Sequence, residues 1–245
     1  FLVALNNMRR ALAEELAEPL IATVERHAAS PPYNPNTKHA AHRKLRAHAL
    51  SLLCAAGQKE IREDACQRAV ALYRSADNMT DTIAALTALR DVDHPLRTEL
   101  YDDFEKRWRD NPLVLDKWFA LEAAAFRHPF RCHNADALTR LDELTQHPAF
   151  SLKNPNRVRA VLGVFAHRNI AAFHAADGSG YRFIANHIDT LDNLNPQVAA
   201  MLLNAFTPWA NLAEPQRSQA QQVLKGLTEK TRSPEVAELL DKLLA

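Results

Sequence analysis

Residues 195–209 read NPQVAAMLLNAFTPW. The apolar side chains of this stretch recur at i, i+3, i+4, i+7, i+8 and i+11, which places them on one face of an α-helix: Val198, Met201, Leu202, Ala205, Phe206 and Trp209. Asn195 can cap the free amides of the first turn, and Pro196 suits the first helical position because no hydrogen bond is lost there. The stretch therefore predicts a helix over 196–211 with one buried face.

The same helical period continues along the chain, and period-two alternation is absent. Helices are expected at residues 2–16, 18–29, 38–56, 59–76, 79–91, 95–109, 112–127, 134–147, 155–168, 179–193, 196–211, 215–230 and 234–244, with separate loops only at 30–37 and 170–178. Only 5 of the 245 residues are glycine, too few for the hairpins of an all-β fold or the glycine-rich loops of a Rossmann core. The predicted fold class is therefore all-α.

The helix starts repeat at a regular interval. Asn-Pro pairs at 111–112, 154–155 and 195–196 begin 43 and 41 residues apart, and Ser233-Pro234 follows 38 residues after Asn195. Each interval holds two predicted helices. A period near 40 built from helix pairs is typical of an armadillo/HEAT-like α-solenoid, in which stacked pairs bury their apolar faces against one another. The alternative is an irregular helical domain in which Asn-Pro merely starts several helices.

Charge and cysteine content exclude several classes of protein. Lys and Arg number 30 against 29 Asp and Glu, and the two signs are interspersed, so no nucleic-acid partner is expected. Cys54, Cys66 and Cys132 form an odd, sparse set that favours a reducing, cytoplasmic compartment. No run of apolar residues is long enough to span a bilayer, so no membrane association is expected. Phe1 lies inside a helical pattern, which indicates a piece of a larger protein.

The histidines do not form a recognisable zinc protease motif. None of the 11 is followed by Glu, so H-E-x-x-H, which presents two imidazoles and a general base on one helix face, is absent. His39, His42 and His48 share one predicted helix, but no carboxylate lies between them. Solvated histidines on a helix surface are the simpler interpretation, and a metal-binding module built from these three residues is the alternative.

Two other clusters carry little chemistry. The segment RHPFRCH contains His128, Cys132 and His133 but lacks further ligands at a defined spacing. Ser179 lies between two glycines without the preceding strand of a nucleophile elbow, so a helix start capped by Asp177 or Ser179 is expected there. The free amides of that helix start could instead bind a carboxylate or a phosphate. No catalytic residue and no metal ligand is predicted.

Two arginines occupy an unusual position. Arg157 and Arg159 lie in the first turn of the predicted helix 155–168, where the positive end of the helix dipole disfavours cations. Another interaction must therefore favour them, either a surface salt bridge or an anionic ligand.

Several long strings resemble one family. NPNRVRAVLGVFA (154–166), AAFHAADGSGYRF (171–183), LNPQVA (194–199) and LVLDKWF (113–119) are similar to the C-terminal domain of the bacterial aminopeptidase N family, large zinc-dependent alanyl aminopeptidases. The likeness is strongest over about 113–200 and continues more loosely to Ala245. It implies that residues 1–245 form a single helical, armadillo-like C-terminal domain, a fragment of a multidomain enzyme.

The resemblance also implies which domain of the enzyme holds the catalytic groups. In that family, zinc, the general base and the group that holds the substrate's free amine lie in upstream domains, so this chain needs no cofactor of its own. The expected partners are the upstream catalytic domain and peptide substrates. The family's terminal domain contributes side chains to the chamber above the active site, and these match Arg159 and Gln197. A further family Arg falls on Met201, a departure that puts firm binding of peptide carboxylates in doubt.

A second class of function remains open from the sequence. An independent α-solenoid could act as a scaffold that binds a protein partner on its concave face. The sequence upstream of Phe1 discriminates the two, because only the peptidase hypothesis requires H-E-x-x-H there.

Overall fold

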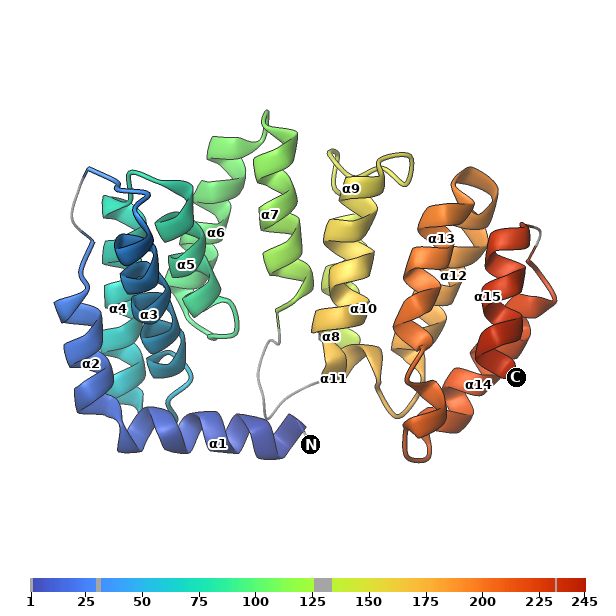
Figure 1. Cartoon of the computed structure of the whole chain (residues 1–245), viewed down its shortest axis with the longest axis horizontal. Coiled ribbons are helices and arrows are strands. Elements are labelled where there is room, and N and C mark those ends of the chain that lie inside the picture. The colour runs from blue at the N-terminus through green and yellow to red at the C-terminus, as the bar shows by residue number, and fades with distance from the viewer. Residues whose placement is uncertain (1, 30–31, 126–133, 232) are drawn as a thin grey trace. The chain divides into compact units, whose positions relative to one another are not determined.

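The computed structural model describes residues 2–29, 32–125, 134–231 and 233–245 (Figure 1). His128, Cys132 and His133 therefore lie outside the described residues. Within the described ranges the chain consists of helices and connecting turns, without a strand, so the all-α prediction is confirmed. None of the described helices combines the length and the apolar character needed to cross a membrane.

The chain divides into two compact units, which meet in sequence near Leu121. The helices of the first unit are α1 (Leu2–Glu15), α2 (Ala17–Arg26), α3 (Thr37–Leu53), α4 (Lys59–Ser75), α5 (Met79–Leu89), α6 (Pro95–Trp108) and most of α7 (Pro112–Ala123). The segments of the second unit are α8 (Asn134–Gln146), α9 (Pro155–Val158), the π-helix η1 (Arg159–Gly163), α10 (Val164–Arg168), α11 (Ile170–Phe173), α12 (Ser179–Leu194), α13 (Pro196–Leu203), the 3₁₀ turns η2 (Asn204–Phe206) and η3 (Trp209–Asn211), α14 (Gln216–Thr228) and α15 (Pro234–Leu244).

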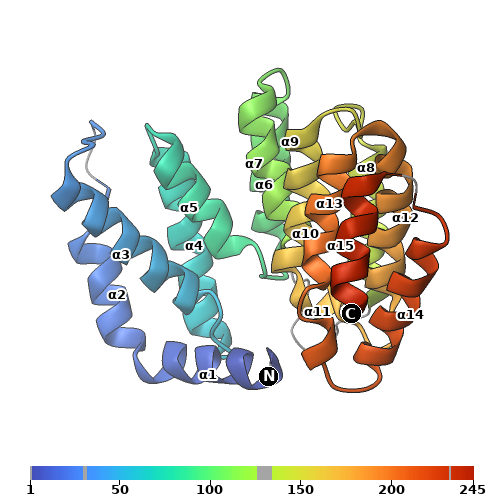
Figure 2. The same cartoon turned by 45° about the vertical axis from the view of Figure 1, so that its right-hand side comes forward.

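The first unit is built from helix pairs. Helix α2 packs against α3 and α4 packs against α5, while α3 and α5 contact each other across the pairs (Figure 2). Their facing sides bury Leu50, Leu53, Leu86 and Leu89 almost completely. One buried ion pair crosses this core, because Arg46 Nη2 lies 2.5 Å from Asp81 Oδ1.

An aromatic cluster forms the centre of the second unit. The Phe173 ring packs edge-on against Tyr181, with ring centroids 5.1 Å apart, and against Phe206 at 5.4 Å. Edge-to-face contacts of this kind add stability beyond the burial of apolar area. Helices α12 and α13 pack along each other, and α15 covers α13.

The predicted caps are present at all four repeated helix starts. The side chain of Asn111 accepts a hydrogen bond from Val114 N, Asn154 from the amides of Asn156 and Arg157, Asn195 from Val198 N, and Ser233 from Val236 N. Each cap satisfies amides that the first turn of a helix leaves free. The repeated Asn-Pro and Ser-Pro pairs therefore mark helix starts, as the sequence predicts.

Helix ends differ from the prediction by up to a few residues, as at α2 and α3, and two segments differ more. Within the expected loop 170–178, Ile170–Phe173 forms a helical turn, because Ala172 and Phe173 pack into the core and leave only 174–178 as a turn. The expected helix 196–211 ends as an α-helix at Leu203 and continues as two 3₁₀ turns. Pro208 explains the second difference, since its ring would clash with the Asn204 carbonyl in a continuous α-helix.

Candidate functional site

The three residues that the resemblance assigns to substrate lie on adjacent segments of the second unit. Arg159 begins η1, Gln197 is the second residue of α13, and Met201 follows Gln197 by about one turn on the same helix face. Gly163, the last residue of η1, lies where η1 meets α13. A Cβ atom on Gly163 would lie 3.8 Å from Met201 Sδ and 3.9 Å from Arg159 Cβ. The structure therefore brings the three predicted residues to one face, the Arg159–Met201 face.

A π-helical turn positions Arg159. The amide of Val164 donates to the Arg159 carbonyl, five residues back, and to the Val161 carbonyl, instead of making the i to i−4 bond of an α-helix. Such turns are rare and occur often at functional sites, because they alter the direction of side chains without ending the helix. The expected helix 155–168 is thus present as α9, η1 and α10, with the irregular turn at the site.

The side chain of Arg159 is exposed and keeps its positive charge available. Its closest polar contact is weak, with 3.4 Å between Nη1 and Asn156 Oδ1. Across the described part of the chain no carboxylate forms an ion pair with Arg159, so a surface salt bridge does not account for it. Arg157 differs, since its side chain is 2% exposed and belongs to the protein interior.

Gln197 and Met201 add an amide and an apolar group beside this charge. Gln197 is exposed, and its side chain makes no hydrogen bond to any of the residues that the structure describes. Met201 is half-buried, and its thioether rests over Gly163. The face therefore offers one guanidinium, one amide that can both donate and accept, and one flexible apolar side chain.

The start of α12 is occupied by its own cap. Gly178 adopts a left-handed conformation with φ of 69°, and Asp177 Oδ1 accepts hydrogen bonds from the Ser179 amide at 3.0 Å and the Ser179 hydroxyl at 2.7 Å. These hydrogen bonds lower the pKa of Asp177. Because a carboxylate of the chain already takes the helix amide, the expected cap is confirmed and an external anion finds no place at that amide.

The histidines that lie together in the first unit are His27, His39 and His42, not the set of His39, His42 and His48 that the sequence suggests. The His42 ring centroid lies 4.5 Å from that of His27 and 6.1 Å from that of His39. His27 follows α2 and was not singled out by the sequence, whereas His48 does not line the pocket that the other three share. No three His, Cys, Asp or Glu residues of the described ranges have the arrangement of a metal site, so the metal-binding alternative gains no support.

Comparison with known protein families assigns the chain to one of them. A family model described as a domain of unknown function (DUF3458_C) with ARM repeats matches residues 2–245. The chain belongs to this family. Membership in an ARM-repeat family confirms the armadillo-like solenoid predicted from the period near 40.

Relatives of the ARM-repeat domain are aminopeptidases. Aminopeptidase N of Escherichia coli (strain K12) is 37% identical over 196 residues, which are 80% of this chain and 21% of that protein. Aminopeptidase N of Haemophilus influenzae is 43% identical over 131 residues, 54% of this chain and 14% of that protein. The resemblance to the C-terminal domain of aminopeptidase N is thereby confirmed, and the chain spans about a fifth or less of these relatives.

A solved structure agrees with the sequence relatives. The crystal structure of Legionella pneumophila aminopeptidase A in complex with aspartic acid superposes with a TM-score of 0.82 and 28% identity. The match covers 97% of this chain and 27% of the Legionella chain. The fold is therefore that of one segment of a larger aminopeptidase.

Proposed function

We propose that this chain is the C-terminal domain of a zinc-dependent aminopeptidase and that it contacts peptide substrates through the Arg159–Met201 face. The observation that carries the proposal is Arg159, an exposed arginine without a carboxylate partner among the described residues, beside Gln197 and Met201. A guanidinium forms strong, charge-assisted hydrogen bonds with a carboxylate. The C-terminal carboxylate of a short peptide is the matching group.

Each residue of the face has a distinct role in this proposal. Arg159 binds the peptide carboxylate, and Gln197 donates to and accepts from the peptide backbone. Met201 supplies an adaptable apolar contact where the resembling family has an Arg, so only one guanidinium holds the distal end of the peptide. Binding of the carboxylate is then weaker than with two cations, and the domain restricts access to the active site more than it fixes the substrate.

Peptide bond hydrolysis belongs to another part of the polypeptide. The resemblance assigns zinc and the general base to an upstream catalytic domain, and H-E-x-x-H is absent from this sequence. We place the whole enzyme in the cytoplasm. Support comes from Cys54 and Cys66, which are both buried free thiols, as is usual for a reducing compartment.

A stripe of exposed apolar residues on α1 and at Leu16, which directly follows it, supports an upstream partner. Leu5, Met8, Leu12 and Leu16 repeat at intervals of three or four and are 36–53% exposed. This spacing places them along one face of the helix. A row of exposed Leu and Met side chains is usually covered by another surface. The remainder of the polypeptide, about four-fifths of the length of the E. coli relative, is the proposed cover.

Substitution of Arg159 in the intact enzyme tests the proposal. Arg159→Ala should raise KM for di- and tripeptides by roughly five- to tenfold, about 1–1.4 kcal/mol, because one charge-assisted hydrogen bond is lost. KM for an alanyl chromogenic amide should stay unchanged, because that substrate has no distal carboxylate. Arg168→Ala is the matched control, since Arg168 is exposed on the same helical run without belonging to the face. An equal effect of Arg159→Ala on both substrates would remove the proposed role.

Two observations separate this function from an independent scaffold. The gene should continue upstream of Phe1 with H-E-x-x-H followed by a distant Glu. The isolated 245-residue chain should not hydrolyse alanyl amides, because its sequence lacks H-E-x-x-H; measurable hydrolysis by pure chain would contradict the proposal.

A further inference from the structure

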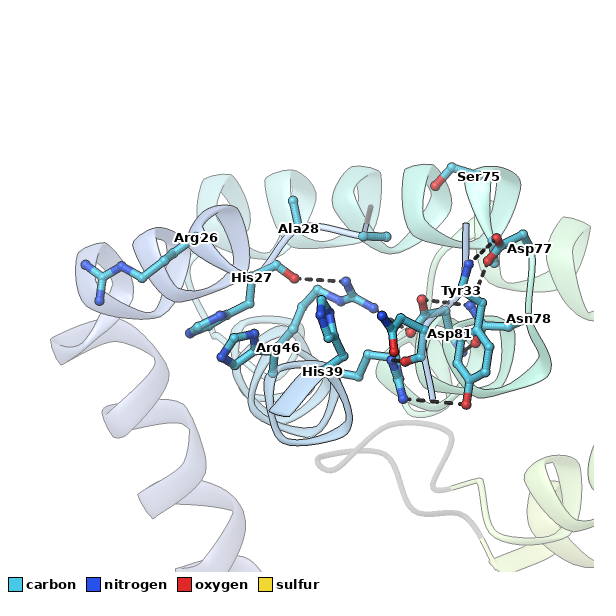
Figure 3. Close-up of a pocket in the computed structure, with 15 residues that line it drawn as sticks. Arg26, His27, Ala28, Tyr33, His39, Arg46, Ser75, Asp77, Asn78 and Asp81 are labelled. Atoms are coloured by element: carbon cyan, nitrogen blue, oxygen red, sulfur yellow. Dashed lines mark hydrogen bonds and ion pairs between the residues drawn. The ribbon is translucent and has the colours of Figure 1, made fainter. Parts of the chain in front are cut away.

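The first unit contains a pocket that the proposed peptidase function does not use. A cavity of about 150 Å³ lies where the end of α2, the first turns of α3 and the turn between α4 and α5 meet (Figure 3). Its lining includes three histidines, three arginines and two aspartates: His27, His39, His42, Arg26, Arg43, Arg46, Asp77 and Asp81. Such a concentration of ionisable groups in one concave site is a candidate for ligand binding.

The imidazoles retain their hydrogen-bonding capacity. His39 and His42 lie on one face of α3. His27 directly follows α2, and its ring centroid lies 4.5 Å from that of His42. Among the residues that the structure describes, none of these three rings has a hydrogen-bond partner. A neutral imidazole offers one donor nitrogen and one acceptor nitrogen, and both nitrogens donate when it is protonated.

The two aspartates are already engaged within the protein. Asp81 pairs with Arg46 at 2.5 Å. Asp77 accepts a hydrogen bond from the Tyr33 amide at 2.8 Å and one from the Asn78 side chain at 3.0 Å. These hydrogen bonds lower the pKa of Asp77, so it serves as a charged anchor for the segment around Tyr33. The aspartates therefore hold the wall of the pocket together instead of offering ligands for a cation.

Once Arg46 pairs with Asp81, two arginines, Arg26 and Arg43, remain in the pocket lining against one aspartate, Asp77. Arg43 contacts neutral groups, with Nη1 2.7 Å from the Asn34 carbonyl and its guanidinium carbon 4.5 Å from the centre of the Tyr33 ring. Arg26 is exposed at the rim. Burial lowers the pKa of His42, and the nearby positive charges of His27, Lys38 and His39 lower it further. A bound anion would oppose that repulsion.

We propose that this pocket binds a small tetrahedral oxyanion, either a free ion of the sulfate or phosphate kind or the phosphate group of a small ester. His27 and His42 donate to its oxygens, and Arg43 supplies the permanent positive charge. An oxyanion suits a site rich in donors, and a metal ion is disfavoured because no three potential ligands of the described ranges have a metal-binding arrangement. The proposal rests on the first unit alone and is independent of the peptidase function.

Binding should depend on pH, because imidazoles gain charge near neutrality. Three elements bring ionisable groups to the pocket that contains His42: Arg26 and His27 at the end of α2, His39, Arg43 and Arg46 on α3, and Asp77 and Asp81 at the α4–α5 turn. Lys38, which does not line the pocket, is a further positive neighbour of His42. Because the pKa of His42 is lowered, affinity for an anion should rise only as the pH falls below about 6.5.

Calorimetric titration with sulfate tests the site, because sulfate remains a dianion over this pH range. Sulfate should bind the purified chain about tenfold more tightly at pH 6 than at pH 8, with ionic strength held constant by chloride. His42→Ala should weaken binding at pH 6 by about tenfold. His48→Ala is the matched control, since His48 is exposed on the same helix but does not line the pocket, and its effect should stay below about twofold.

A second substitution tests the charge itself. His42→Lys should retain binding at pH 8 and weaken the pH dependence, since a lysine stays protonated there. Displacement of sulfate by phenyl phosphate at equal or higher affinity assigns a phosphate ester, and no displacement assigns the free ion. The proposal fails if sulfate does not saturate at pH 6, if His42→Ala and His48→Ala behave alike, or if one equivalent of zinc binds through His42 while sulfate does not.

Discussion

The packing of α11 against the start of α12 depends on one missing methyl group. Gly180 is buried, and a Cβ atom there would lie 2.6 Å from the Phe173 carbonyl oxygen and 2.7 Å from Phe173 Cα. Ordinary contacts of a Cβ atom are 3.4–4 Å, so the two segments would have to separate by nearly 1 Å. Because the opposing atoms are backbone, a side-chain rotation cannot relieve the clash. Gly180→Ala should therefore lower the free energy of unfolding by about 2–3 kcal/mol, near the upper end of overpacking costs.

A second glycine provides the matched control. Gly226 lies within α14, and a Cβ atom there would meet nothing within 4 Å. Gly226→Ala should raise the free energy of unfolding by about 0.5–1 kcal/mol, because alanine loses less backbone entropy in a helix. The same chemical change therefore has opposite signs at the two positions, and only the space around the added methyl differs.

Thermal unfolding followed by far-UV circular dichroism measures both effects. For a chain of this length, the predicted loss at Gly180 corresponds to a fall in Tm of roughly 4–12 °C. Hydrogen exchange with mass spectrometry should localise the loss of protection to α11 and α12. A Gly180→Ala variant as stable as the parent chain would show that α11 can move away freely and would refute the packing argument.

Three further predictions concern buried polar groups. Asp81→Ala should lower the free energy of unfolding, measured by urea denaturation, by about 3–5 kcal/mol, because Arg46, 3% exposed, loses its counter-ion. A loss below about 1 kcal/mol would contradict the burial of that pair. Ser233→Ala removes the cap of α15 and the hydrogen bond that the Ser233 hydroxyl donates to buried Asp192, so it should lower the free energy of unfolding by about 1–3 kcal/mol and raise exchange of the Val236 amide. Burial lowers the pKa of His187, so the unfolded chain binds a proton at higher pH than the folded chain and stability should fall as the pH drops below about 6.5. His187→Gln should flatten the dependence of unfolding free energy on pH between 7 and 5, and an unchanged slope would exclude this histidine as its source.

Features governed by local chemistry could be predicted from the sequence. A helix cap needs only an Asn or Ser and the amides two or three residues later. The helix starts at Asn154, Asn195 and Ser233 could therefore be predicted directly. The apolar period likewise predicted the buried face of α13, where Val198 and Leu202 are buried, whereas the apolar row along α1 is exposed. Arg159 also stood out locally, as a cation in the first turn of a helix, and the structure confirms that no carboxylate within the described ranges explains it.

Features that depend on tertiary packing could not be predicted in this way. The π-turn at 159–163 is one such feature, because no residue of RAVLG distinguishes it from an α-turn in the sequence. His27 lies beside His42 because α2 packs against α3, and the spacing of the histidines in the sequence does not predict that contact. The end of α13 is different, since Pro208 was a visible signal for a break.

The π-turn at Arg159–Gly163 makes the aim of one side chain sensitive to chain length. A variant with one residue deleted between 159 and 163 could close an unbroken α-helix from Pro155 to Arg168, with a regular hydrogen-bond ladder. Each residue of an α-helix advances the direction of its side chain by about 100°, so the deletion would turn Arg159 by that angle relative to the buried Phe165. The guanidinium would then point away from Met201. The extra residue of the π-turn therefore rotates Arg159 relative to the helix that follows, while the buried face of that helix keeps its register.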